Sequence, residues 1–236
     1  MIYENIFFSL YGTIIEARTD ETQGFLWRVI CDVYKRNSAR YEAEEFKKSF
    51  YRSIIEQKEG KDDGFEVDVL KVFKKLYEEK GVNVNEEELL NTAKEFRRAS
   101  TLSLSAYDGA MECLRELKKL GKRIYLLADA QSCYCKYELE SLNLLKYFDD
   151  VFISSDYGVK KPSEQFFSVA FDKYRLKKES SVLIGNDEIG DIVGGRNFGI
   201  DTVYIKGEDE KTESTPPATY IFSCRNFLAI TKILSV

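Results

Sequence analysis

The stretch NIFFSLYGT, residues 5–13, decides the fold. Its first part, residues 5–9, is an apolar run of strand length, and it ends abruptly at Tyr11, Gly12 and Thr13, a composition typical of a turn. Ligands of open α/β sheets bind beyond the carboxyl ends of the strands. We therefore expect a buried strand that leads into a functional loop, with Ser9 where a catalytic loop would carry a carboxylate.

Five more apolar runs of strand length follow, at residues 123–128, 150–154, 181–185, 201–205 and 219–223. From residue 108 onward they alternate with helical patterns, which is typical of a parallel sheet with helices on both faces. The helix expected over 108–121 has Gly121 as its C-terminal cap. Its apolar stripe is Ala110, Cys113, Leu114, Leu117 and Leu120.

Residues 17–100 contain helical patterns and no convincing strand. Four apolar stripes predict four helices, with breaks near 59–64 and 80–85. The stripes are Phe25, Leu26, Val29, Ile30 and Val33; Phe46, Phe50 and Ile54; Val69, Leu70, Phe73, Leu76 and Tyr77; and Leu89, Ala93 and Phe96. The fold class is therefore α/β. A Rossmann-like core of residues 1–16 and 101–236 carries an inserted helical-bundle cap of residues 17–100, and residues 207–217 are expected to form a solvated loop.

Composition excludes several classes of function. The 236 residues carry a net charge of -5, which provides no basic field for nucleic acid, and no apolar run approaches the length of a membrane span. With no cationic, apolar leader at the N-terminus, we expect a cytoplasmic protein. The five cysteines are scattered and odd in number, which argues against a disulfide framework. The chain has no histidine, so Ser-His and Cys-His catalysis and histidine metal ligands are excluded.

Four short motifs follow four of the expected strands. They are Ser9, Tyr11, Gly12 and Thr13; Ala128 and Asp129; Lys160, Lys161 and Pro162; and Asn186, Asp187 and Asp191. This order resembles the haloacid dehalogenase superfamily, which consists mostly of phosphatases and dehalogenases with a cap inserted after the first strand. The resemblance covers essentially the whole chain.

The resemblance implies roles for the first loop. In the family the loop begins with a nucleophilic Asp that forms a covalent intermediate, and Ser9 stands in its place. Tyr11 occupies the second position, where phosphatases carry an Asp that acts as general acid and base and dehalogenases carry Tyr. Gly12 and Thr13 match the family, with the Thr13 hydroxyl at the junction of sheet and cap.

The second motif of the family uses a Ser or Thr hydroxyl to hold the substrate anion. Ala128 lacks that hydroxyl, and Asp129 adds a negative charge beside the anion. At about 5 Å and an effective dielectric constant of about 20, two like charges repel by roughly 3 kcal/mol. The alternative is that Asp129 only caps a helix that starts near Gln131.

The third and fourth motifs imply a lysine and a magnesium site. Lys161 matches the lysine that pairs with the nucleophile and the anion, with Lys160 as a less favoured substitute. Magnesium ligands would be the backbone carbonyl of Tyr11 together with Asn186, Asp187 and Asp191, a set that predicts weak binding because Asn186 replaces an acid. Alternatively, Asp187 belongs to a solvated helix terminus.

Three functional hypotheses follow. The first is a family member that has lost phosphoryl transfer and binds a small anionic or phosphorylated ligand between cap and core as a regulatory module. The second is an active magnesium-dependent hydrolase of small phosphorylated metabolites with a rearranged site. In that case Ser9 would need Lys161 as its base, with a pKa lowered by burial and by loss of its aspartate partner. The third is a vestigial pocket whose cap binds a protein partner.

Overall fold

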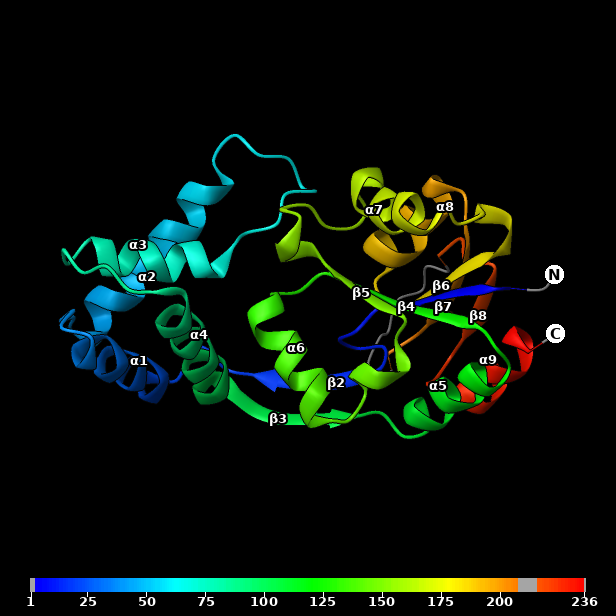
Figure 1. The fold of residues 1–236 in the computed structure, drawn as a ribbon, viewed down its shortest axis with the longest axis horizontal. Coiled ribbons are helices and arrows are strands. Elements are labelled where there is room, and N and C mark those ends of the chain that lie inside the picture. Colours follow the sequence, from blue (N-terminus) through cyan, green and yellow to red (C-terminus); the bar gives the residue numbers. More distant parts are fainter. Residues whose placement is uncertain (1–2, 208–215, 236) are drawn as a thin grey trace.

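The computed structural model describes residues 3–207 and 216–235. Its core is a six-stranded sheet in the order β5-β4-β1-β6-β7-β8, with every neighbouring pair parallel. All six predicted strands are present, and they occupy the centre of the core (Figure 1). Their bounds are β1 (Asn5–Phe8), β4 (Arg123–Ala128), β5 (Asp150–Ile153), β6 (Ser181–Gly185), β7 (Asp201–Ile205) and β8 (Tyr220–Phe222).

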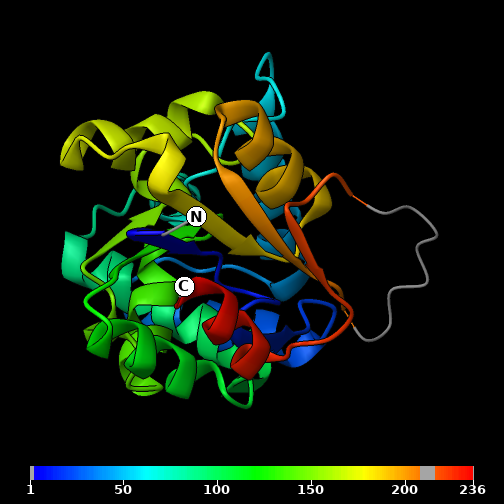
Figure 2. The same ribbon diagram turned by 90° about the vertical axis from the view of Figure 1, so that its right-hand side faces the viewer.

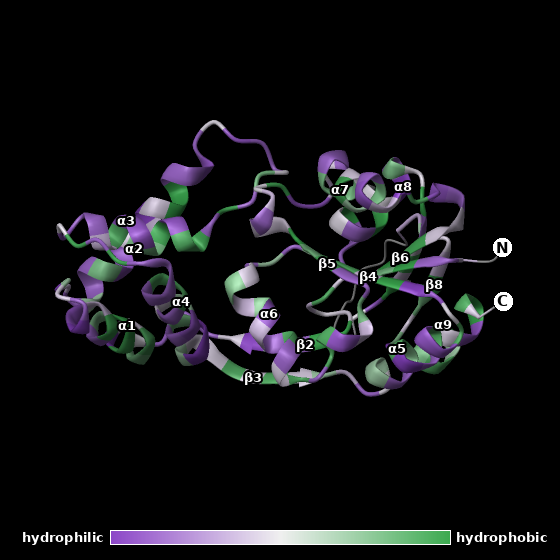
Figure 3. Ribbon diagram, viewed as in Figure 1, coloured by the Kyte–Doolittle hydropathy of each residue, from purple (hydrophilic) through white to green (hydrophobic). Residues whose placement is uncertain are grey.

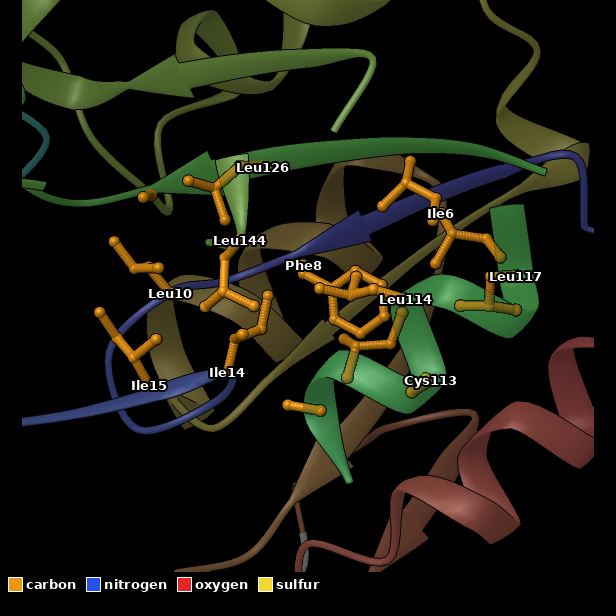
Figure 4. Close-up of a cluster of buried hydrophobic side chains, with 14 of the residues drawn as sticks. Ile6, Phe8, Leu10, Ile14, Ile15, Cys113, Leu114, Leu117, Leu126 and Leu144 are labelled. Carbon is orange, nitrogen blue, oxygen red and sulfur yellow. The ribbon is translucent and has the colours of Figure 1, made fainter. Parts of the chain in front are cut away.

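Helices cover both faces of this sheet, as predicted. Figure 2 shows α7 (Glu164–Tyr174) and α8 (Gly194–Phe198) on one side, and α5 (Ala110–Lys119) and α9 (Phe227–Leu234) on the other. Side chains of a strand alternate between its faces, so Ile6 and Phe8 of β1 join one buried cluster and Phe7 joins the other. In Figure 4, Ile6 and Phe8 lie with side chains of α5 in the first cluster.

Shorter elements complete the core. Helix α6 (Ser132–Ser141) follows β4, and the remaining turns are η1 (Leu145–Tyr147), η2 (Ser154–Asp156), η3 (Lys178–Ser180) and η4 (Glu188–Val193). One prediction for α5 is wrong: Leu120, assigned to the buried stripe, lies beyond the end of the helix and is half exposed. The loop expected at 207–217 falls largely on residues 208–215, which lie outside the described part of the chain.

The cap is the predicted four-helix insertion. Its helices are α1 (Gly24–Arg36), α2 (Ala43–Lys58), α3 (Val69–Glu78) and α4 (Glu86–Ser100), with breaks where the sequence indicates them. Polar and apolar residues alternate around these helices in Figure 3, and the apolar sides meet in a separate buried cluster. The prediction of Phe25 in the apolar stripe is wrong, because its side chain is 56% exposed. Trp27, two residues further and on the other side of the helix, is buried against Phe50 and Phe96 instead.

Two strands that the sequence pattern does not predict join cap and core. β2 (Ile15–Thr19) and β3 (Thr101–Ala106) form an antiparallel ribbon, so the prediction of no strand within 17–100 is wrong at its first three residues. Both strands are partly exposed and polar, and their stability comes from pairing with each other across more than 80 residues of chain. A local pattern does not report such pairing. No helix in the described ranges is long and apolar enough to cross a bilayer.

Candidate active site

The loops after β1, β4 and β6 and the segment after β5 meet around the ammonium group of Lys161. Its Nζ donates hydrogen bonds to Ser9 Oγ at 3.1 Å, to the carbonyl oxygen of Leu127 at 2.8 Å and to Asp191 Oδ1 at 2.6 Å. The three side chains that form this group are buried: Ser9 is 8% exposed, Lys161 3% and Asp191 0%. The structure therefore brings together three of the residues that the sequence selected.

Asp191 is held by two backbone N–H groups as well as by Lys161. Its Oδ2 accepts hydrogen bonds from the backbone N–H groups of Asn186 and Asp187, at 3.1 and 3.0 Å. Gly185 is required here, because a Cβ at this position would lie 2.2 Å from Asp191 Oδ2. Asp191 is thus a fully bonded, buried anchor for the lysine.

The charge of Lys161 follows from these neighbours. Burial alone would lower the pKa of the ammonium group, but the carboxylates of Asp191 and Asp129 outweigh it, and the pKa is raised. Lys161 therefore stays protonated at neutral pH and donates to Ser9 instead of accepting its proton. The expectation of a lysine with a lowered pKa and no carboxylate partner is wrong, because Asp191 supplies the partner.

Asp129 is bonded to the backbone of Lys161 and is close enough to act on its charge. Its Oδ1 accepts a hydrogen bond from the backbone N–H of Lys161 at 3.1 Å, and burial raises the pKa of its carboxyl group. The alternative role as a helix cap is wrong: Gln131 is the N-cap residue of α6. Ala128 is buried in the same hydrophobic cluster as Ile6 and Phe8, and its side chain offers no polar atom to an anion.

Thr13 and Asn186 connect two of the loops. Thr13 Oγ1 donates to Asn186 Oδ1 at 2.8 Å. Gly12 has φ +76°, and a Cβ there would lie 2.4 Å from Asn186 Nδ2, so the first loop packs directly against the amide. The Thr13 hydroxyl thus holds the β1 and β6 loops together.

The Tyr11 side chain points into a different network. Its hydroxyl donates to Glu138 Oε2 at 2.7 Å, and Glu138 Oε1 accepts from Arg97 Nε at 2.6 Å. The Arg97 guanidinium lies over the Tyr11 ring, 5.5 Å from its centre. Burial raises the pKa of the phenol, so Tyr11 is a poor acid at neutral pH. It links the first loop to cap helix α4 through Glu138 of α6. No motif or spacing in the sequence marks Arg97 or Glu138.

The loop between α2 and α3 docks on the core beside the site. The backbone N–H of Lys160 donates to the Gly64 carbonyl at 2.8 Å, and the N–H of Glu66 donates to the Gly158 carbonyl at 3.1 Å. Glu66 also accepts from Ser154 Oγ at 2.7 Å. Burial raises the pKa of Glu66, and the nearby Asp129 raises it further. These contacts hold the cap against the core and add a second carboxylate near the predicted anion position.

The comparison with known families matches this arrangement. The family model described as haloacid dehalogenase-like hydrolase matches residues 32–205, well over half of the chain. The chain belongs to the haloacid dehalogenase-like hydrolase family. The match begins at residue 32, after the loop that contains Ser9.

Curated relatives of the chain include phosphatases. The glyceraldehyde 3-phosphate phosphatase of Methanocaldococcus jannaschii is 30% identical over 133 residues, 56% of this chain and 58% of the relative. The protein of the same name from Pyrococcus furiosus is 33% identical over 98 residues, 42% of this chain and 41% of the relative. The chain thus spans about half of the length of the curated relatives it matches.

Solved structures support the haloacid dehalogenase-like fold across the whole chain. The putative hydrolase YfnB of Bacillus subtilis, solved with bound magnesium, has a TM-score of 0.58 at 21% identity and covers 100% of both chains. The 2-haloacid dehalogenase of Pseudomonas syringae has a TM-score of 0.64 at 16% identity and covers 99% of both chains. At these identities the likeness concerns the fold alone.

The predicted magnesium ligands of this family member do not fit a magnesium site. Asp191 is buried and fully bonded, and the amide oxygen of Asn186 already accepts from Thr13. Asp187 Oδ1 accepts from two backbone N–H groups and caps η4, which confirms its alternative assignment to a helix terminus. Within the described ranges, no three His, Cys, Asp or Glu side chains form a group that could hold a metal ion. Magnesium prefers several charged oxygen ligands in octahedral geometry, which these residues do not present.

Proposed function

We propose that this protein is a haloacid dehalogenase-like pseudoenzyme that has lost phosphoryl transfer and acts as a binding or regulatory module. One observation carries the proposal: the Lys161 ammonium donates a hydrogen bond to Ser9 Oγ. The side-chain group hydrogen-bonded to the serine oxygen is therefore a proton donor.

The chemistry of an alcohol explains why this matters. A serine hydroxyl is a weak nucleophile at neutral pH unless a neighbouring base accepts its proton. Lys161 has a raised pKa, and the chain contains no histidine. Loss of the nucleophile in a serine protease lowers turnover by about a millionfold, and we expect a loss of the same order here.

The surroundings of Ser9 also oppose a phosphate dianion. The Lys161 charge is compensated by Asp191. Burial raises the pKa values of the Asp129 and Glu66 carboxyl groups; Asp191 and Asp187 raise that of Asp129 further, and Asp129 raises that of Glu66. Ala128 offers no hydroxyl where the family uses one. Weak binding of phosphate beside Ser9 is the expected consequence.

A second function is supported by the curated relatives. Two of them are named glyceraldehyde 3-phosphate phosphatases, and the buried pair of Lys161 and Asp191 is intact. The alternative is therefore an active phosphatase of small phosphorylated metabolites that uses a rearranged site.

Phosphatase assays on three matched proteins separate the two functions. The native chain, Ser9→Ala and Ser9→Asp are incubated with magnesium and either 4-nitrophenyl phosphate or glyceraldehyde 3-phosphate, and released product is measured. We expect no release above background from the native chain or Ser9→Ala, and a gain in Ser9→Asp. Hydrolysis by the native chain that disappears in Ser9→Ala, together with an added phosphoryl mass on Ser9, would establish the phosphatase instead.

A further inference from the structure

A cavity lies at the junction of cap and core, apart from the residues around Ser9. Its volume is about 290 Å³, and it is bounded by cap helix α4, core helix α6 and strand β3. Helices α4 and α6 stand side by side with β3 beneath them (Figure 1). Arg97 and Glu138 form part of its wall, but Ser9, Asp129 and Lys161 do not line it.

The wall of this cavity combines apolar and cationic groups. Its lining is mostly apolar and includes Leu104, buried Tyr134 and exposed Tyr137. Lys94 and Arg98 lie at its rim, one helical turn apart on the same face of α4. The only carboxylate in the wall, Glu138, is already paired with Arg97. The cavity therefore has an apolar body and a net positive rim.

The two rim cations have no partner of their own. Both side chains are exposed, and neither forms an ion pair or hydrogen bond with the described residues. A basic residue in the last turn of a helix interacts favourably with the negative end of the helix dipole, and this explains the presence of a cation at Arg98. The helix dipole does not explain Lys94, which precedes the last turn, and it does not explain the apolar cavity that Lys94 and Arg98 line.

We propose that this cavity binds a small amphipathic anion, with an aryl or alkyl body in the cavity and a carboxylate or phosphate head between Lys94 and Arg98. Liquid water occupies about 30 Å³ per molecule, so the cavity has room for about ten non-hydrogen atoms. That is the size of a substituted benzene ring with its head group. Apolar lining with a few placed charges is the usual composition of a ligand site.

Such a ligand would contact the cap and the core together. Because α4 belongs to the cap and α6 to the core, its binding stabilises the arrangement in which the two helices are close. The site thus gives the protein a means of coupling a ligand to the position of its cap. This proposal does not depend on whether Ser9 is catalytic.

Isothermal titration of the full chain tests the site with probes that a phosphatase cannot cleave. Benzoate and phenylphosphonate carry both features, inorganic phosphate carries only the charge, and benzyl alcohol carries only the ring. We expect the two aryl anions to bind at least ten-fold more tightly than either single-feature probe. A difference between benzoate and phenylphosphonate identifies the preferred head group. Equal binding of all four probes, or no binding of the aryl anions, overturns the proposal.

Variants locate the binding. Lys94→Gln with Arg98→Gln removes two exposed, unpaired charges and should weaken phenylphosphonate about ten-fold or more without changing the thermal midpoint. Tyr137→Glu, at an exposed wall position, should weaken it similarly by placing a negative charge at the rim. Lys48→Gln, an exposed cation of α2 outside this cavity, is the matched control and should leave affinity unchanged. Binding that survives in the Lys94, Arg98 double variant would place the ligand elsewhere and refute the assignment.

Discussion

Removal of the Lys161 ammonium tests the central feature of the site. In Lys161→Met, a side chain of similar length replaces the buried cation, and Asp191 loses its only charged hydrogen-bond donor. The carboxylate remains 0% exposed, with only two backbone N–H groups to stabilise it. Breaking a buried ion pair from one side costs about 3 to 5 kcal/mol. For a chain of this size that lowers the thermal midpoint by roughly 6 to 20 °C.

Urea unfolding can follow the two parts of the molecule separately. Far-UV circular dichroism reports on cap and core together, whereas fluorescence reports on the cap, because the single tryptophan, Trp27, is buried there. We expect Lys161→Met to shift the dichroism transition more than the fluorescence transition. Lys177→Met removes an exposed lysine of the core and should change stability by less than about 0.5 kcal/mol.

A second substitution separates charge from packing. Asp191→Asn in the Lys161→Met background removes the unpaired charge, so the double variant should be more stable than Lys161→Met alone, by about 1 to 3 kcal/mol. The raised pKa of Lys161 sets the pH range over which the Lys161–Asp191 ion pair stabilises the protein. Its stabilisation is complete below its ordinary pKa of 10.5 and is lost only as the pH rises through the folded-state value. A cost below about 1 kcal/mol for Lys161→Met, or no recovery in the double variant, would refute the reasoning.

Three further predictions follow. Asp129→Asn keeps the acceptor for the Lys161 N–H, and because burial raises the pKa of Asp129, the variant should unfold at a higher urea concentration than the native chain at pH 7. This gain should shrink as the pH falls through the raised folded-state pKa of Asp129 and be absent below its ordinary pKa of 3.8. Asp63→Asn, at an exposed position, should show no gain. Gly185→Ala places a Cβ on the buried Asp191 carboxylate and should cost about 3 kcal/mol or more in a urea titration. Gly24→Ala, at the start of α1, places a Cβ at an ordinary contact distance of 3.6 Å from the Arg28 guanidinium and should be neutral or stabilising by up to about 1 kcal/mol. Millimolar magnesium should leave the thermal midpoint of the native chain within about 1 °C of its value in EDTA, and a clear rise would show a bound metal.

The candidate site was only partly predictable from the sequence. The order of polar residues after the strands brought Ser9, Lys161 and Asp191 into one group, because parallel strands end at the same edge of a sheet. The assignment of partners within that group was wrong for Lys161, which pairs with Asp191. Such pairing depends on rotamers and loop packing, and no spacing along the chain records it.

The sequence by itself determined the six strands, the four cap helices and the identity of the residue at position 9. These follow from periodicity and residue type, which depend on near neighbours in the chain. Only the tertiary structure decided that Lys161 is a protonated donor to Ser9, that Tyr11 joins Arg97 through Glu138, and that β2 pairs with β3. Each of these contacts joins residues tens of positions apart or more, so its energy comes from desolvation and geometry that exist only after the chain has folded.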